Sequence, residues 1–260
     1  MKIILNSIFI LSFVVFNKLS AQETSTYQTG EWLRFRIHYG WFNASEATLK
    51  VEEENFQGRN VHHITGHGES TGLLGVFFKV DDTYKTYIDK ESNLPVHFIR
   101  KINEGGYKKH TIINFDHLEN DATVHNKLKE TTEVFSIRPQ TQDLLSAFYF
   151  LRNKISDQDL NPGDKLVVNM FFDNENYKFV SKFLGKETLK TKFGKIECLK
   201  FRPYVQAGRV FKEKESLTFW VSADKNHIPI KIKAELAVGS LEADLAAFKG
   251  LKYPFKIIVD

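Results

Sequence analysis

A glycine-flanked serine is the first residue whose neighbours could support catalysis. The run Gly68-Glu69-Ser70-Thr71-Gly72 matches the pattern Gly-x-Ser-x-Gly, which presents a nucleophilic serine on a sharp turn in α/β hydrolases. That turn needs a strand before it and a helix after it in a parallel sheet, and only the strand is indicated here. We interpret the run as a glycine-flanked loop, and a hydrolase that uses Ser70 remains the alternative.

Three histidines near this serine could contribute to a metal site. His63 and His67 fall on one face of a strand, about 13 Å apart at roughly 3.3 Å per residue, and His62 points to the other face. Zinc ligands lie within about 2.1 Å of the metal, so a site would need residues from a distant strand. We expect exposed or edge histidines and no metal, and we keep a histidine metal site within the hydrolase alternative.

The acids, the cysteine and the overall charge point to no particular chemistry. Asp81 and Asp82 alternate across a strand, and Asp116 is typical of a solvated turn, so no acid–base pair is expected. The only cysteine, Cys198, is predicted to lie in the core as a small hydrophobic residue. The net charge of +4 comes from lysines spread between acids, which does not support nucleic-acid binding. No cofactor is predicted.

Aromatic residues make up 13% of the chain, which is enough for a large core. Five of these aromatic residues, named below, are of interest, and packing in the core is their default role. If a sheet curls incompletely, the same residues would line an apolar groove that takes a lipid-like tail or a segment of a partner protein. These candidate ligand-binding residues are Phe77, Phe78, Phe148, Tyr149 and Trp220.

One long stretch, residues 141–156, has the spacing of an amphipathic helix. Leu144, Leu145, Phe148 and Ile155 recur at helical intervals, and Thr141 is a suitable N-cap.

Most of the remaining chain is predicted to form strands. The clearest lies in the segment from Gly30 to Phe42, where alternation puts Trp41 on the buried face with Leu33 and Phe35. Strands and helices do not alternate, so the fold is predicted to be all-β and mainly antiparallel. About 12–15 short strands must curl or close, since sheet twist prevents so many from staying flat. We predict a curled sheet, a spiral or a half-barrel, capped by the central helix 141–156.

The N-terminal segment indicates export. Residues 1–21 combine Lys2, an apolar core and a small-residue cleavage site after Ala21, as in a signal peptide. No cysteine follows the apolar core, so no lipid-modified N-terminus is expected, and no later stretch predicts a membrane span. We expect a periplasmic protein with a disordered segment 22–29 and a single β-rich domain at 30–260, possibly two β halves joined across the helix.

Several short motifs resemble one family. The chain is similar, over roughly residues 30–245, to an exported bacterial family catalogued as domain of unknown function 3108. The motifs are Gly30-Glu31-Trp32-Leu33, Phe78, Asp82, Tyr84, the run Asp143-Leu144-Leu145-Ser146-Ala147-Phe148-Tyr149, Pro162-Gly163-Asp164, Trp220, Ile228-Pro229-Ile230 and Gly239-Ser240. Where the family has Ala-Gly after the first strand, this chain has Ala44-Ser45. The resemblance implies a fold akin to spiral or half-barrel envelope proteins, including lipoprotein carriers, and it implies no site, because the family has no agreed activity.

These observations favour an exported, non-enzymatic protein of the cell envelope. It is expected to bind an apolar, lipid-like ligand or an envelope partner protein in the groove of a curved sheet. The hydrolase described above and a purely structural interaction module are the alternatives.

Overall fold

A computed structural model describes residues 25–72, 75, 78–156, 159–204, 217–236 and 238–259. Fourteen strands and one helix, α2 (Leu144–Ser156), are defined in this part of the chain. The strands are β1 (Trp32–Tyr39), β2 (Phe42–Phe56), β3 (Arg59–Ser70), β4 (Asp81–Asp89), β5 (Pro95–Glu104), β6 (Tyr107–Asp116), β7 (Asp121–Asn126), β8 (Thr131–Ser136), β9 (Lys165–Phe172), β10 (Glu175–Thr191), β11 (Gly194–Tyr204), β12 (Leu217–Ser222), β13 (Pro229–Glu235) and β14 (Ser240–Lys249). No helix in the described residues has the length and apolar character needed to cross a bilayer.

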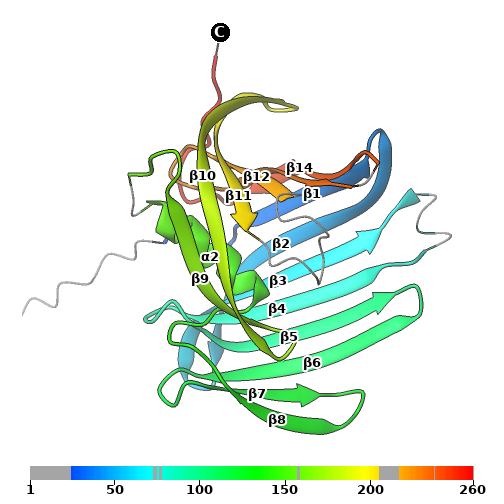
Figure 1. The fold of residues 1–260 in the computed structure, drawn as a ribbon, viewed down its shortest axis with the longest axis vertical. Coiled ribbons are helices and arrows are strands. Elements are labelled where there is room, and N and C mark those ends of the chain that lie inside the picture. Colours follow the sequence, from blue (N-terminus) through cyan, green and yellow to red (C-terminus); the bar gives the residue numbers. More distant parts are fainter. Residues whose placement is uncertain are drawn as a thin grey trace, which may run out of the picture.

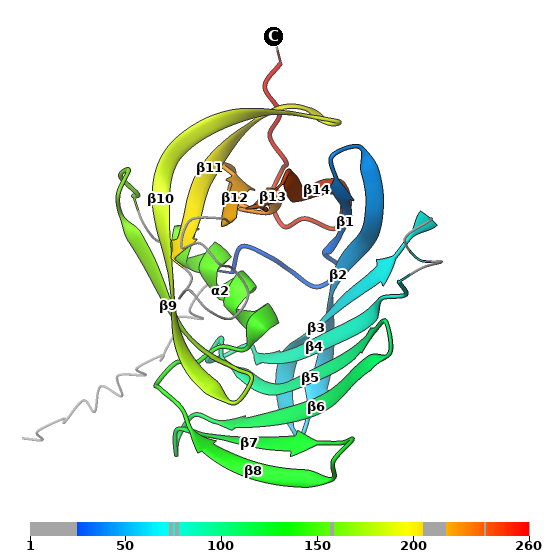
Figure 2. The same cartoon turned by 45° about the vertical axis from the view of Figure 1, so that its right-hand side comes forward.

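All fourteen strands form one antiparallel sheet in the order β8-β7-β6-β5-β4-β3-β2-β1-β14-β13-β12-β11-β10-β9. The sheet curls until β9 and β10 come round in front of α2, which lies inside the curve (Figures 1 and 2). The two edge strands, β8 and β9, are neighbours in sequence and are separated only by the helix. The sheet does not close, because β8 and β9 do not pair with each other. The predicted all-β, curled architecture with a central helix is therefore confirmed.

The predicted first strand is in fact a hairpin. β1 ends at Tyr39, and the chain turns at Gly40, whose φ of 55° suits a residue without a side chain. The prediction that Trp41 shares the buried face was wrong, since Trp41 is 89% exposed at the tip of this turn. Alternation does hold within β1, where Leu33 and Phe35 are buried.

The helix begins later than the sequence predicted. Gln142 forms a parallel bridge with Met170 of β9, so the chain is still extended at that position. Asp143, and not Thr141, is the N-cap: its Oδ1 accepts the backbone N–H groups of Leu145 and Ser146 at 2.8 and 2.9 Å. The helix therefore starts at Leu144, because the bridge to β9 holds the preceding residues out of helical geometry.

Two buried contacts fix the helix inside the curl. At its start, the Thr86 hydroxyl on β4 donates to Asp143 Oδ2 at 2.5 Å. Near its end, Arg152 donates from two guanidinium nitrogens to Glu31 at 2.6 and 2.8 Å, and both side chains are at most 1% exposed. Arg152 also donates from Nε to the Asn226 carbonyl at 3.0 Å, so this one residue joins the helix to the start of β1 and to the β12–β13 connection.

The expectation of a disordered segment at 22–29 fails for the part that the structure describes. Ser25, Thr26 and Tyr27 are at most 3% exposed. Thr26 donates to Asn153 of the helix from its backbone N–H at 2.9 Å and from its hydroxyl at 3.0 Å, and the Tyr27 ring packs edge-on against Tyr149 at 4.6 Å. These polar residues are ordered because they meet polar groups on the helix, which composition alone does not reveal.

The open side of the sheet is bridged by charged side chains. The β9–β10 turn places Asp173 against the inner face of β5 and β6, where Arg100 donates to it at 2.7 Å and Lys109 also binds it. The Arg100 guanidinium lies over the Phe172 ring at 4.6 Å. These contacts hold the two arms of the curl together where no backbone pairing does.

The pH dependence of stability should report the buried N-cap. Burial raises the pKa of Asp143 from 3.8 to about 6. Because the folded-state pKa lies above the unfolded value, this group adds stability as the pH falls through 6 towards 4. Relative to Asp143→Asn, which keeps a capping oxygen but does not titrate, the wild type should gain about 2 kcal/mol in free energy of unfolding between pH 7 and pH 4.5, measured in urea.

Asp116 provides a matched control of opposite sign. It also accepts two backbone N–H groups, in an exposed turn, and these hydrogen bonds lower its pKa. The wild type should therefore lose stability relative to Asp116→Asn as the pH falls. A difference between the wild type and Asp143→Asn that stays flat, or that shrinks in acid, would show that Asp143 is not a buried titrating cap.

Candidate functional site

A hollow of about 350 Å³ opens on the inner face of the sheet beside the start of α2. It is formed by β1, β2, β3 and the first residues of β4, with the helix as the opposite wall. Its size lies at the lower end of the range typical of small-molecule sites. The inward-facing residues that line it are Ile37, Ser45, Ala47, Leu49, Gly66, Gly68, Val80, Asp82, Tyr84, Leu144 and Leu145.

Two glycines of β3 shape this hollow. Gly66 and Gly68 alternate onto the inner face, where other strands carry large side chains. A Cβ at Gly66 would come within 3.3 Å of Leu145 and Leu49, so Gly66 lets the helix approach. At Gly68 the nearest heavy atom of the described residues to an added Cβ is 4.0 Å away, so none of these residues fills the space above it. Neither glycine has a positive φ, so the backbone conformation does not require glycine at either position. What both positions require is the absence of a side chain.

Polar groups stand at one side of the hollow. Asp82, which is 7% exposed, accepts the Asn103 backbone N–H at 3.0 Å. A hydrogen bond with Asp82 raises the pKa of Glu104, so the two carboxyl groups lie in contact. Burial raises the pKa of Tyr84, which stays a neutral phenol and bonds to Arg100. The hollow thus has an apolar floor and an acidic side, with no hydrolytic pair evident among these residues.

A second, smaller hollow of about 170 Å³ lies under the β9–β10 turn. Polar side chains line most of it, including Lys109, Thr111, Asn126 and Glu133. Lys109 is bound to Asp173, so its charge is already paired. This hollow is a by-product of the contacts that bridge the open side of the sheet.

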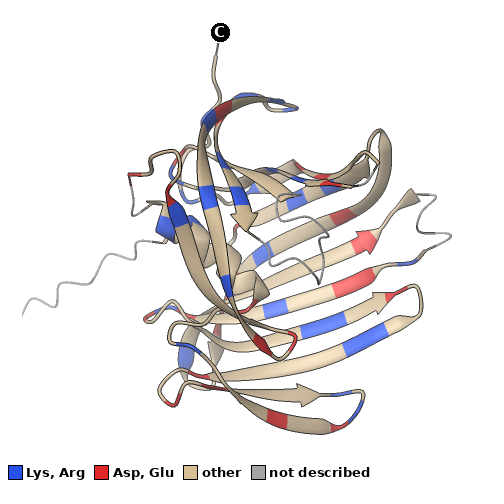
Figure 3. Cartoon of the chain, viewed as in Figure 1, with Lys and Arg blue, Asp and Glu red and all other residues tan. Residues whose placement is uncertain are grey.

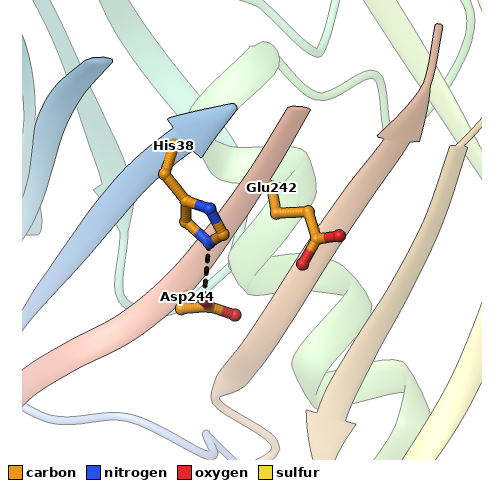
Figure 4. A group of neighbouring side chains, drawn as sticks. All are labelled: His38, Glu242 and Asp244. Atoms are coloured by element: carbon orange, nitrogen blue, oxygen red, sulfur yellow. Dashed lines mark hydrogen bonds and ion pairs between the residues drawn. The ribbon is translucent and has the colours of Figure 1, made fainter. Parts of the chain in front are cut away.

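One group in the described residues has the composition of a metal site. His38, Glu242 and Asp244 present ligand atoms within 4.8 Å of one another on the outer face (Figure 4). A cation already occupies the space between the carboxylates, because Lys231 Nζ lies 2.7 Å from Glu242 and 3.3 Å from Asp244. His38 Nε2 is 2.8 Å from Asp244 Oδ2, and Arg36 is 3.7 Å from the same oxygen. The group is a satisfied ion cluster that joins β1, β13 and β14.

The comparisons with known proteins identify a family. The model described as "Protein of unknown function (DUF3108)" matches residues 34–246, which is most of the sequence. The chain belongs to this family. Among curated proteins, none matches the DUF3108 protein.

Solved structures support the fold of the DUF3108 protein. It is similar to the beta-barrel-like protein of domain of unknown function DUF1849 from Brucella abortus, with a TM-score of 0.53 and 9% identity over 86% of this chain and 99% of that chain. It is also aligned with a DUF1089 family protein from Pseudomonas aeruginosa, at a TM-score of 0.38 and 8% identity over 71% and 87% of the two chains. The first likeness concerns the fold alone, and the second is too weak to argue from.

The five aromatic residues proposed as a groove do not form one lining in the DUF3108 protein. Tyr149 is fully buried and Phe148 packs against the same cluster, whereas Trp220, at 7% exposure, belongs to a different core cluster. Phe78 is 46% exposed beside Gly105, and Phe77 lies outside the described residues. The hollow is lined instead by other residues, and the signal that sequence analysis missed was the Gly-x-Gly pair at 66 and 68.

The serine and cysteine candidates occupy structural positions. The Ser70 hydroxyl accepts the Val80 backbone N–H at 2.9 Å, and Ser70 ends a strand of an antiparallel sheet, not of the parallel sheet of a hydrolase elbow. Cys198 is fully buried, as predicted, and burial raises the pKa of its thiol to about 12.

The three histidines diverge. His63 and His67 do share the outer face, where His63 stacks on Tyr87 at 4.3 Å and pairs with Glu54 at 3.0 Å. The expectation of an exposed histidine was wrong for His62, which is 3% exposed and packs 5.1 Å from the Tyr27 ring. It is buried because the ordered segment around Tyr27 covers that part of the inner face.

Proposed function

We propose that this DUF3108 protein is a non-enzymatic binding protein of the cell envelope that holds the apolar part of an amphiphile in the hollow beside α2. The observation that carries the proposal is the space above Gly68, which no described side chain fills, beside inner-face residues such as Leu33 and Ile64 that are fully buried. A cavity lined by Leu, Ile and Ala side chains favours an apolar occupant, because burying apolar surface is favourable and no strong polar partner is needed.

An exposed apolar rim beside the hollow supports the same role. Every second connection of an antiparallel sheet lies at the same end, and the hairpins β1–β2, β5–β6 and β7–β8 project together in Figure 1. Ile37 lies close in sequence to the β1–β2 turn, and Val80 forms a bridge with Glu104 at the end of β5, beside the β5–β6 turn. The rim comprises Tyr39, Trp41, Phe42, Phe78, Tyr107, Leu128, Leu236, Val238 and Leu241, each at least 40% exposed. Apolar surface of this extent is typical of sites that meet a membrane or a partner protein, from which an apolar ligand could enter.

Filling the hollow should weaken ligand binding without unfolding the protein. Gly68→Leu places a side chain where an added Cβ meets nothing closer than 4.0 Å, so it should fold. Each apolar group of the size of a CH₂ that can no longer be buried in the hollow costs about 0.8 kcal/mol of binding free energy. The affinity for the neutral fluorophore N-phenyl-1-naphthylamine should therefore fall about tenfold or more. Fluorescence titration measures the affinity, and thermal unfolding confirms the fold.

Thr65→Leu is the matched control, because it adds a leucine to the same strand on the outer face, at a residue that does not line the hollow. It should leave fluorophore binding unchanged. A wild-type protein that does not bind the fluorophore, or a Gly68→Leu variant that binds it equally well, would contradict a ligand site in this hollow.

We also propose that the protein is exported, as the pattern of residues 1–21 suggests. The first described residues, from Ser25, are buried, so cleavage after Ala21 would leave this packed segment intact. Protein recovered from the periplasmic fraction of a bacterial host should begin at Gln22 by intact mass spectrometry. Full-length chain confined to the cytoplasm would contradict export.

A further inference from the structure

Among the described residues that line the hollow, one charged side chain points inward. Glu46, His67 and Glu69 also border it, but strand alternation turns their side chains to the outer face, where Glu46 lies 3.8 Å from Arg34. Asp82 alternates inward, next to Tyr84 along β4. A ligand in the hollow therefore meets one charged side chain, and it is an acid.

The acid is held in place and reinforced by a second one. Asp82 Oδ1 accepts the Asn103 N–H at 3.0 Å, which fixes the carboxylate against β5. The Glu104 carboxyl, which is also on β5, forms a hydrogen bond with Asp82.

Gly68 leaves this acid uncovered on the side that faces the hollow. Gly68 and Asp82 are directly paired across the β3–β4 ladder. The side chains of such paired residues lie about 4.5–5.5 Å apart at Cβ, so any other residue at 68 would shield the carboxylate. The glycine that opens the cavity thus also exposes its acidic group to a ligand.

The nearby cations are paired with a different acid. Arg100 lies close enough to lower the pKa of Glu104, but its guanidinium binds Asp173 at 2.7 Å. Lys109 binds the same aspartate. Figure 3 shows both signs of charge along β4 to β6, so the acidic side of the hollow is a local feature and not part of a broad acidic surface.

We propose that the ligand is a single-chain amphiphile whose head group donates hydrogen bonds and carries no negative charge, and that Asp82 selects this head group. The inference rests on the proposed function, because it assigns the polar end of a ligand whose chain lies in the hollow. A carboxylate head would be placed beside an existing carboxylate in a poorly solvated wall, and like charges repel strongly there. An ammonium or hydroxyl head would instead donate to Asp82.

Head-group preference can be measured with amphiphiles of equal chain length. Dodecylamine, monododecanoyl glycerol and dodecanoate are each added, below their critical micelle concentrations and at pH 7.5, to the protein with bound N-phenyl-1-naphthylamine. The loss of fluorescence measures how much fluorophore each amphiphile displaces. Dodecylamine should displace the fluorophore at a concentration about tenfold or more below that needed for dodecanoate, which corresponds to about 1.4 kcal/mol. The neutral glyceride should also bind more tightly than dodecanoate.

Asp82→Asn keeps the acceptor for Asn103 and removes the charge, so the difference between amine and carboxylate should shrink to about threefold or less. Glu52→Gln removes one negative charge from the outer face of β2, away from the hollow, and should keep the full preference. A wild-type protein that binds dodecanoate as well as dodecylamine, or an Asp82→Asn variant that retains the preference, would overturn this inference alone. Failure of the wild type to bind any probe would overturn it together with the proposed function.

Discussion

The ion pair between Arg152 and Glu31 is the interaction on which the arrangement of this protein depends. Both side chains are fully buried, and the guanidinium binds the carboxylate through two nitrogens. Removing either partner leaves a charge without a counter-ion in the core, at a cost of about 3–5 kcal/mol. The rings of Tyr27, Phe148 and Tyr149 lie within 6 Å of the guanidinium and add cation–π attraction. The pair therefore fixes where the helix can lie relative to β1.

The position of the helix in turn determines where the sheet is filled and where it is empty. From Tyr149 to Ile155 the helix packs on buried residues of both halves of the sheet. At its start, Leu145 packs over Gly66, and no side chain of the described residues covers the inner face at Gly68. A helix held at both ends, by Asp143 and by Arg152, cannot move to fill that space. The hollow is thus a consequence of how the helix is anchored and of two missing side chains.

Sequence reasoning predicted the class of fold because that information is local. Alternation in β1 and helical spacing after Leu144 are visible in the residues themselves. The turn at Gly40 was missed because the alternation of Tyr39 and Trp41 continues across it. The buried segment around Tyr27 was missed because its partners, Asn153 and Arg152, lie far away in sequence.

The candidate site was harder to predict because it is formed where side chains are missing. Large aromatic residues such as Trp220 and Tyr149 attract attention, yet they fill the core. The space for a ligand comes from glycines, whose effect depends on which residues face them across the sheet. That Gly68 pairs with Asp82 follows from the register of β3 and β4, which the sequence does not specify.

A double-mutant cycle on Arg152 and Glu31 tests the central claim most directly. The free energy of unfolding is measured in urea for Arg152→Met, Glu31→Gln and the double variant. Each single change should cost about 3–5 kcal/mol, and the double change should cost clearly less than their sum, because it leaves no unpaired charge. Additive losses of less than about 1 kcal/mol each, the size expected for a solvent-exposed pair, would contradict a buried ion pair that positions the helix.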